Sequence, residues 1–281
     1  MRYSYVELGV RGDTYRYHYG KRSSTHQTYW IYCCSGGQPI ERDRLPTLPG
    51  YDSLQNGYKR MWEVGRADVK AGNVDNDPVP TATSLRWGVS VIARLAPPLA
   101  ATFETLADSC RPLCGENHTF YNRTNFHITV RSCAFHRFGV SQHDPAIRVY
   151  RTVLADVCGH YSPFDIAYCG LNANRTGVIA QSYPLSETLQ ALRGALHDRL
   201  INLDLQHGPE EDGVRHTAHT SIMVFGGPVT DSAGLYSWIS ANREAWYGAA
   251  RVTHLSLVRY NRTAYDVNPV SLAEFALETR P

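Results

Sequence analysis

The chain has 281 residues, 43% of them hydrophobic, and a formal net charge of +2. A chain of this length can bury the core of one large domain, while so mild a charge argues against duplex DNA or an anionic membrane as a partner. No apolar run reaches the roughly 20 residues that span a bilayer. The N-terminus lacks the basic head and apolar stretch of a secretory signal, which predicts a cytoplasmic protein.

The basic residues and the cysteines narrow the class of protein further. Only three of the 28 basic residues are lysines; arginine suits phosphate, although genome base composition explains the same bias. Seven sparse cysteines, an odd number, argue against a disulfide scaffold. Without a secretion signal, the four Asn-x-Thr sequons are interpreted as polar turns: Asn117, Asn122, Asn174 and Asn261.

The first 80 residues differ from the rest. Alternating tyrosines in YRYHY, residues 15–19, predict a strand or hairpin. Two segments rich in Gly and Pro, 35–53 and 71–84, predict loops, and the second predicts a domain boundary. The sequence therefore predicts an N-terminal extension over 1–80, rich in strands and loops and of unknown role, followed by a catalytic domain over 81–281.

Regular elements are predicted from residue 87 onward. The patterns predict, in order, a strand at 87–95, a helix at 97–113, a strand at 125–135, two strands within 162–184, a helix at 185–203 capped by Ser186, a strand at 216–227, a helix at 231–246 and a closing hairpin over 251–277. This order predicts an α+β fold with two similar lobes.

Two of the predicted strands carry the same polar pattern. In FHITV, His127 and Thr129 share one strand face, and in AHTSIMV, His219 and Ser221 do so. The opposite faces are mostly apolar. A single His-x-Thr is more often packing than catalysis, but two copies on apolar-backed strands, 92 residues apart in the sequence, favour one shared site.

Such a site would suit phosphodiester chemistry. One imidazole could take a proton from the attacking oxygen while the other gives a proton to the leaving oxygen. The two hydroxyls could donate hydrogen bonds to non-bridging phosphate oxygens, where charge must be held. We therefore expect His127 and His219 to be catalytic, and Thr129 and Ser221 to bind phosphate.

These motifs resemble those of the 2H phosphoesterase superfamily, which includes LigT-like RNA ligases and 2′,3′-cyclic phosphodiesterases. The resemblance rests on HIT at 127–129 and HTS at 219–221, and it extends over roughly 86–279. It implies two lobes of antiparallel sheet with flanking helices, a pseudo-twofold relation and a central cleft. It also implies a phosphoric diester hydrolase that needs no metal and no cofactor. The expected substrate is a nucleotide or an RNA end, with a 2′,3′-cyclic phosphate or a 2′-5′ linkage.

Other residues are weaker candidates for this cleft. Arg131 follows Thr129 by two positions, so strand alternation predicts that it faces the cleft and binds phosphate. Tyr121, Tyr183 and Tyr265 could stack a base or hydrogen-bond phosphate, although packing is the commoner role for a tyrosine.

Three alternatives stay open from the sequence. Cys110, Cys114, His118, Cys133 and His136 could form a zinc site, but their spacing is not that of familiar zinc modules. The arginines and tyrosines would also suit an RNA- or nucleotide-binding module without catalysis. An RNA 2′-5′ ligase would share the fold, because ligation reverses the opening of a cyclic phosphate.

Overall fold

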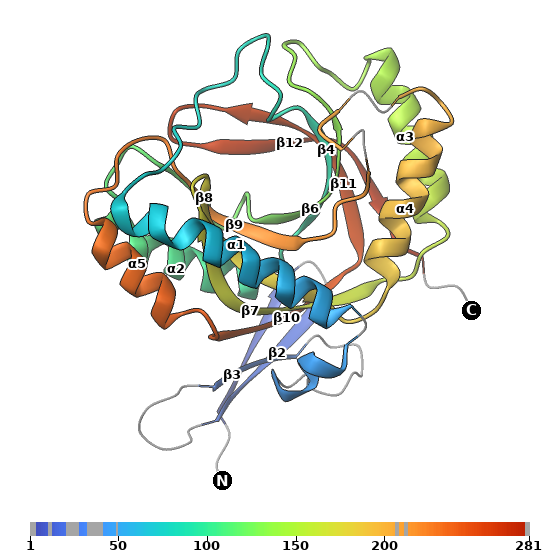
Figure 1. Ribbon diagram of the computed structural model, residues 1–281. Coiled ribbons are helices and arrows are strands. Elements are labelled where there is room, and N and C mark those ends of the chain that lie inside the picture. The colour runs from blue at the N-terminus through green and yellow to red at the C-terminus, as the bar shows by residue number, and fades with distance from the viewer. Residues whose placement is uncertain are drawn as a thin grey trace.

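The computed structural model describes residues 4–10, 13–20, 28–32, 42–48, 50–205, 208–210 and 213–278 (Figure 1). The elements in chain order are β1 (Ser4–Val10), β2 (Asp13–Gly20), β3 (Thr28–Tyr32), the 3₁₀ helix η1 (Arg42–Thr47), α1 (Tyr51–Ala71), β4 (Val89–Arg94), α2 (Pro97–Cys114), β5 (Thr119–Phe120), β6 (His127–Ala134), α3 (Pro145–Cys158), β7 (Phe164–Asn174), β8 (Gly177–Pro184), α4 (Thr188–Ile201), β9 (Ala218–Val224), α5 (Ser232–Ala241), β10 (Trp246–Val252), β11 (His254–Arg262) and β12 (Val267–Ala276).

One large antiparallel sheet forms the centre of the molecule. Among the described residues it has nine strands in the order β10-β7-β8-β9-β6-β4-β11-β12, with β5 paired to β9. The helices α1, α2 and α5 pack on the half that contains β7, β8 and β10, while α3 and α4 pack on the half that contains β6 and β12 (Figure 1). The α+β class is confirmed, and the two predicted lobes are the two halves of one continuous sheet that meet at β6 and β9.

Most elements predicted beyond residue 87 are present. The strands β4, β6 and β9 and the helix α2 fall where the patterns predict them, and 162–184 forms β7 and β8. The helix predicted at 185–203 begins at Thr188, with Glu187 instead of Ser186 at the N-cap position. Residues 251 and 252 end β10, a strand that was not predicted, and β11 and β12 form the predicted hairpin.

The N-terminal region contains an unpredicted helix of 21 residues, α1, which begins at Tyr51 inside the segment predicted as a loop over 35–53; the 3₁₀ helix η1 occupies 42–47 of the same segment. Gly50 and Gly72 flank it in left-handed backbone conformations, which glycine adopts without a steric penalty. A side chain on Gly65 would come within 2.8 Å of the Cα of Asn174, so α1 lies directly against β7. The domain boundary near residue 80 stays a prediction, but α1 packs on the main sheet.

Tyr58 is the principal anchor of α1. Its side chain is fully buried, and its hydroxyl donates to the main-chain carbonyls of Ala218 and of Ser182, the latter at 3.2 Å. In return, the side-chain amide of Asn172 donates to the carbonyl of Tyr58 at 2.8 Å. A residue of α1 is therefore bonded to the position just before His219.

The strand predicted from YRYHY is present as β2, in a separate three-stranded antiparallel sheet with β1 and β3. Among the residues that the structure describes, no helix combines the length and the apolar character needed to cross a bilayer.

Candidate active site

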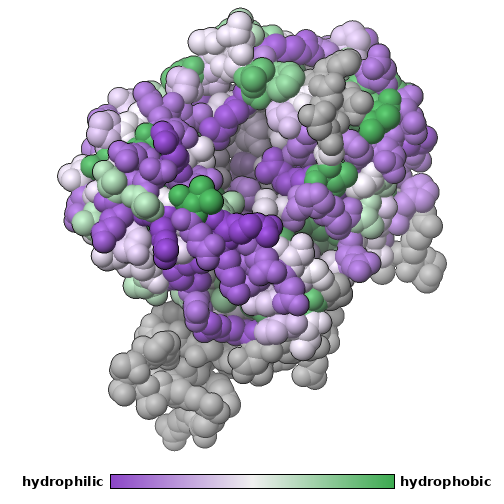
Figure 2. Space-filling model, in the orientation of Figure 1, coloured by the Kyte–Doolittle hydropathy of each residue, from purple (hydrophilic) through white to green (hydrophobic). Residues whose placement is uncertain are grey.

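The two His-x-Thr/Ser motifs lie on adjacent strands at the middle of the sheet. Ile128 of β6 is paired with Thr220 of β9 in antiparallel register. In this register, the neighbouring residues place His127 opposite Ser221 and Thr129 opposite His219. Residues opposite each other in an antiparallel pair share a face of the sheet, with their Cβ atoms about 5 Å apart. All four side chains therefore lie on one face. Figure 2 shows a recess over the middle of the molecule, bordered mostly by hydrophilic side chains.

His127 is held on both ring nitrogens. Its Nδ1 lies 2.7 Å from the carbonyl oxygen of Asn125, and its Nε2 lies 3.0 Å from the hydroxyl of Tyr260. Because a carbonyl only accepts, Nδ1 carries the proton, and Nε2 of the neutral ring accepts from Tyr260. Burial lowers the pKa of His127 to about 4, so this ring is neutral at physiological pH.

A polar turn fixes the carbonyl that receives this hydrogen bond. The side chain of Asn122 accepts from the amide and the hydroxyl of Thr124, at 2.9 and 2.7 Å. The side-chain amide of Asn125 donates to the carbonyl of Val267 at 2.8 Å. Asn174 makes the same two bonds to Thr176, so these two sequons form turns, as predicted.

His219 is partly buried and more loosely held. Its Nδ1 lies 3.4 Å from the hydroxyl of Thr217. Burial is the main cause that lowers the pKa of His219 to about 3, and the charge of Arg215 and the proximity of His127 add to it. The two histidines are thus close enough to influence each other's protonation.

Two arginines that the sequence reading missed organise this region. Arg215 bonds the carboxylate of Glu210 at 2.8 Å, and its charge acts on both histidines. Arg193 of α4 is buried and donates to the carbonyls of Thr129, Val130 and Arg215, at 2.8, 3.0 and 3.0 Å. It thereby ties β6 to the segment that leads into β9. Its place on the apolar stripe of α4, four residues after Leu189 and three before Leu196, was the available signal.

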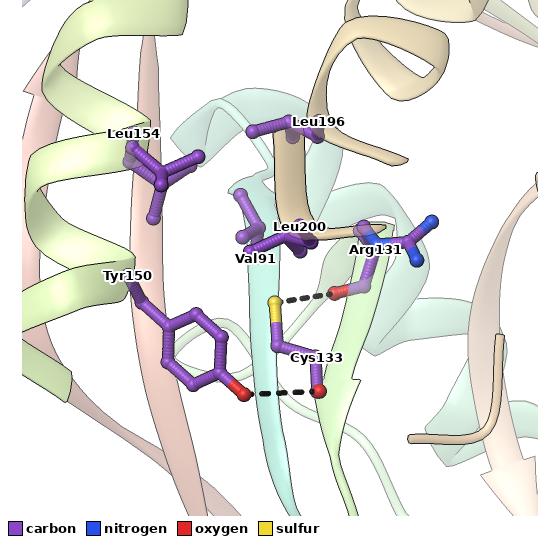
Figure 3. Close-up of a pocket in the computed structure, with 8 residues that line it drawn as sticks. Val91, Arg131, Cys133, Tyr150, Leu154, Leu196 and Leu200 are labelled. Atoms are coloured by element: carbon purple, nitrogen blue, oxygen red, sulfur yellow. Dashed lines mark hydrogen bonds between the residues drawn. The ribbon is translucent and has the colours of Figure 1, made fainter. Parts of the chain in front are cut away.

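The prediction that Arg131 faces the cleft is wrong, and a β-bulge is the reason. Ile92 is opposite Thr129 and Val91 is opposite Arg131, so Val130 is an extra residue that reverses the alternation. Arg131 is 2% exposed and lines a cavity under α3 and α4. Figure 3 shows its guanidinium pointing away from the leucines of that cavity, and one of its nitrogens donates to the carbonyl of Glu210 at 3.3 Å.

The three candidate tyrosines occupy different environments. Tyr121 is buried, and its ring lies 5.9 Å from that of His127. Tyr183 is buried under α1, where its hydroxyl donates to Gln55 or Gln181, so the structure places it in packing. Tyr265 is 64% exposed, in the turn between β11 and β12. A substrate role for Tyr121 and Tyr265 stays a prediction.

The alternative zinc site is not assembled. His118 is buried, with Nε2 donating to the carbonyl of Cys114 and Nδ1 accepting from the amide of Gly226, so both nitrogens serve the fold. Within the described ranges, no three His, Cys, Asp or Glu side chains gather closely enough to hold a metal ion.

Replacing Arg215 and Arg131 one at a time should show that only Arg215 acts at the active site. We expect Arg215→Met to lower kcat/KM by about 10- to 100-fold if the site acts on the phosphate expected from the sequence, because a cation beside the two histidines is lost. Arg131→Met should change kcat/KM by less than about threefold, since the bulge turns the buried Arg131 to the face of β6 opposite to Thr129. Steady-state kinetics of both variants measure this, and a larger loss with Arg131→Met would contradict its placement.

The buried histidines should make stability depend on pH. The pKa of His127 lies near 4 in the fold and near its ordinary value of about 6.5 in the unfolded chain. Between these values the unfolded chain binds more protons, so the free energy of unfolding falls as pH falls. His118 and His219, whose pKa values are also lowered, act in the same direction.

Urea unfolding at pH 7.5 and at pH 5 measures this effect. We expect a lower midpoint at pH 5, and a smaller difference between the two midpoints for His127→Gln. The same difference in both proteins would contradict a buried, neutral His127.

Solved structures provide the comparison for this fold. TT0787 of Thermus thermophilus matches at 14% identity and a TM-score of 0.53, over 68% of this chain and 97% of that protein. A phosphoesterase matches at 12% identity and a TM-score of 0.48, over 69% and 100% of the two chains. LigT of E. coli, complexed with 3′-AMP, matches at 12% identity and a TM-score of 0.47, over 69% and 99%.

No protein-family model matches the sequence, and no curated protein matches it. The chain shares the fold of TT0787, and a phosphoesterase and LigT are among the other matches, in line with the resemblance drawn from the two motifs. Since TT0787 is covered almost entirely by 68% of this chain, the remaining 32% lies outside the shared fold.

Proposed function

We propose that this chain is a phosphodiesterase that cleaves a nucleotide or RNA phosphodiester without a metal, with a 2′,3′-cyclic phosphate or a 2′-5′ linkage as the bond attacked. One observation carries the proposal: two imidazoles and two hydroxyls share one face of adjacent strands. That set supplies a proton acceptor, a proton donor and two hydrogen-bond donors, which together suffice for in-line attack on phosphorus.

In the proposed reaction, one histidine removes a proton from the attacking water as its oxygen bonds to phosphorus. The other protonates the ribose oxygen as the bond between phosphorus and that oxygen breaks. Thr129 and Ser221 donate hydrogen bonds to the non-bridging oxygens, where negative charge increases in the transition state. Neither histidine is assigned to a step, because both rings are neutral before substrate binds.

The charges around the site favour an anionic substrate. Arg94 and Arg215 act electrostatically on His127, and Arg86 and Arg262 act on the hydroxyl of Tyr121. Asp77 bonds both Arg86 and Arg262, and Glu210 bonds Arg215, so the cations exceed the carboxylates in these pairs. An incoming phosphate raises the pKa of a nearby imidazole and so allows one of the two to become the proton donor.

A substrate screen tests the proposal. Purified protein with EDTA is offered 2′,3′-cyclic nucleotides, 2′-5′ oligoadenylate and cyclic oligonucleotides, and products are separated by chromatography. We expect turnover of at least one class, undiminished by EDTA. Joining of RNA ends without hydrolysis would favour the ligase, and saturable binding without turnover would favour the binding module. Activity that is lost with EDTA and restored by Zn²⁺ or Mn²⁺ would contradict the mechanism.

A further inference from the structure

The hydroxyl of Tyr260 contacts the histidine of the first motif. Tyr260 belongs to β11, and β4 separates β11 from β6, so its side chain reaches across one strand to the active-site face. The hydroxyl of Tyr260 lies 3.0 Å from Nε2 of His127. Both Tyr260 and His127 are buried, which removes water as a competing partner.

The intervening strand is built to admit this contact. Ser90 of β4 is paired with Ser132 of β6 and with Val258 of β11, two residues before Tyr260. Ser90 is 4% exposed, and its small side chain leaves room for the ring of Tyr260 to reach β6. The phenol oxygen donates its one hydrogen to Nε2 of His127.

We infer that Tyr260 is a positioning residue for the proposed reaction: by donating to Nε2 it holds the proton of His127 on Nδ1 and aligns the ring with Thr129. The inference rests on the proposed function for its catalytic meaning and on geometry for the tautomer. The carbonyl of Asn125 fixes one end of the imidazole and Tyr260 fixes the other. When substrate arrives, the phenol hydrogen turns away from the ring, and Nε2 becomes free to take a proton.

This role predicts a change that a purely structural tyrosine would not cause. A donor to Nε2 stabilises the neutral imidazole, so removing it should raise the pKa of His127, by about half to one unit for a single hydrogen bond. Tyr260→Phe should also lower kcat by about tenfold while KM changes less than threefold, because the loss affects alignment and not substrate contacts.

Tyr247→Phe is a matched control. Tyr247 and Tyr260 are both 8% exposed, and the Tyr247 hydroxyl has no hydrogen-bond partner within the described part of the chain. Its ring packs edge-on against Phe103 in the core, 5.7 Å between centroids. Removing that hydroxyl should leave kcat and the titration of His127 unchanged.

The test uses ¹⁵N NMR of the histidine rings of the full chain, titrated from pH 8 down to at least one unit below the midpoint of His127, with kinetics on the substrate found by the screen. We expect wild-type His127 to be protonated on Nδ1, and its titration midpoint to rise only in Tyr260→Phe. A proton on Nε2 in the wild type, or an unchanged midpoint in Tyr260→Phe, would overturn the inference. The wild-type tautomer is measured whether or not the variant folds, and it can be read even if every substrate fails, which separates this inference from the proposed function.

Discussion

Replacing either His127 or His219 by alanine should lower kcat by about 10²- to 10⁴-fold, the range for loss of one general acid or base. The double variant should lose less than the product of the two single losses, because both groups act in one transition state. The profile of kcat against pH should be bell-shaped in the wild type, since one imidazole must be neutral and the other charged. Steady-state kinetics with saturating substrate measure all three effects.

Two further sets of variants make this result specific. Thr129→Ala and Ser221→Ala should cost less, about 10- to 10³-fold, as expected for loss of one donor to phosphate. His254→Ala is the control, because His254 is exposed at the start of β11 and should have less than about a twofold effect. If either His127 or His219 can be replaced with less than about threefold loss, the paired-histidine mechanism is wrong.

Tyr58→Ala should lower the free energy of unfolding by about 3–5 kcal/mol, the cost of removing a large, fully buried ring. The variant also loses the hydrogen bonds of the Tyr58 hydroxyl to the carbonyls of Ala218 and Ser182, although the Ser182 hydroxyl still donates to Ala218 at 2.5 Å. Because Ala218 precedes His219, we expect kcat to fall as well, measured at a temperature where the variant remains folded. Urea unfolding and kinetics provide the two measurements.

Two comparisons test the reason for that effect. Tyr58→Phe keeps the ring and removes only the hydroxyl, so it should cost about 1–3 kcal/mol. Tyr265→Ala removes a ring that is 64% exposed and should change stability by less than about 0.5 kcal/mol. A loss with Tyr58→Ala no larger than that with Tyr265→Ala would show that α1 does not belong to the cooperative unit.

The sequence could predict those parts of the site whose geometry is set within a single strand. Strand alternation alone places His127 with Thr129 and His219 with Ser221, and an apolar opposite face shows which side is buried. Arg131 fails by the same rule, because the bulge at Val130 depends on register with β4, which the local sequence does not encode. Tyr260 could not be predicted at all, since its contact crosses a strand and 133 residues of chain.

Two helices, α1 and α3, were not predicted, and only α3 has a clear signal in the sequence. For α3, Asp144 followed by Pro145 is a helix-start signature, and the Asp144 side chain does accept from the amide of Ala146 at 3.0 Å. Ile147, Tyr150 and Leu154 then follow at helical spacing and are buried. By contrast, α1 follows a Gly- and Pro-rich segment and carries many exposed polar residues, so its buried face is defined mainly by the sheet it packs on.

The strand order has a consequence for synthesis of the chain. β4 is an apolar strand whose two neighbours are β6 and β11, so it has an open edge until residues 254–262 have left the ribosome. An open, apolar edge invites pairing with other chains. Messages that end before β11 should therefore yield products that aggregate, and a chaperone that shields β4 during elongation should raise the yield of native protein.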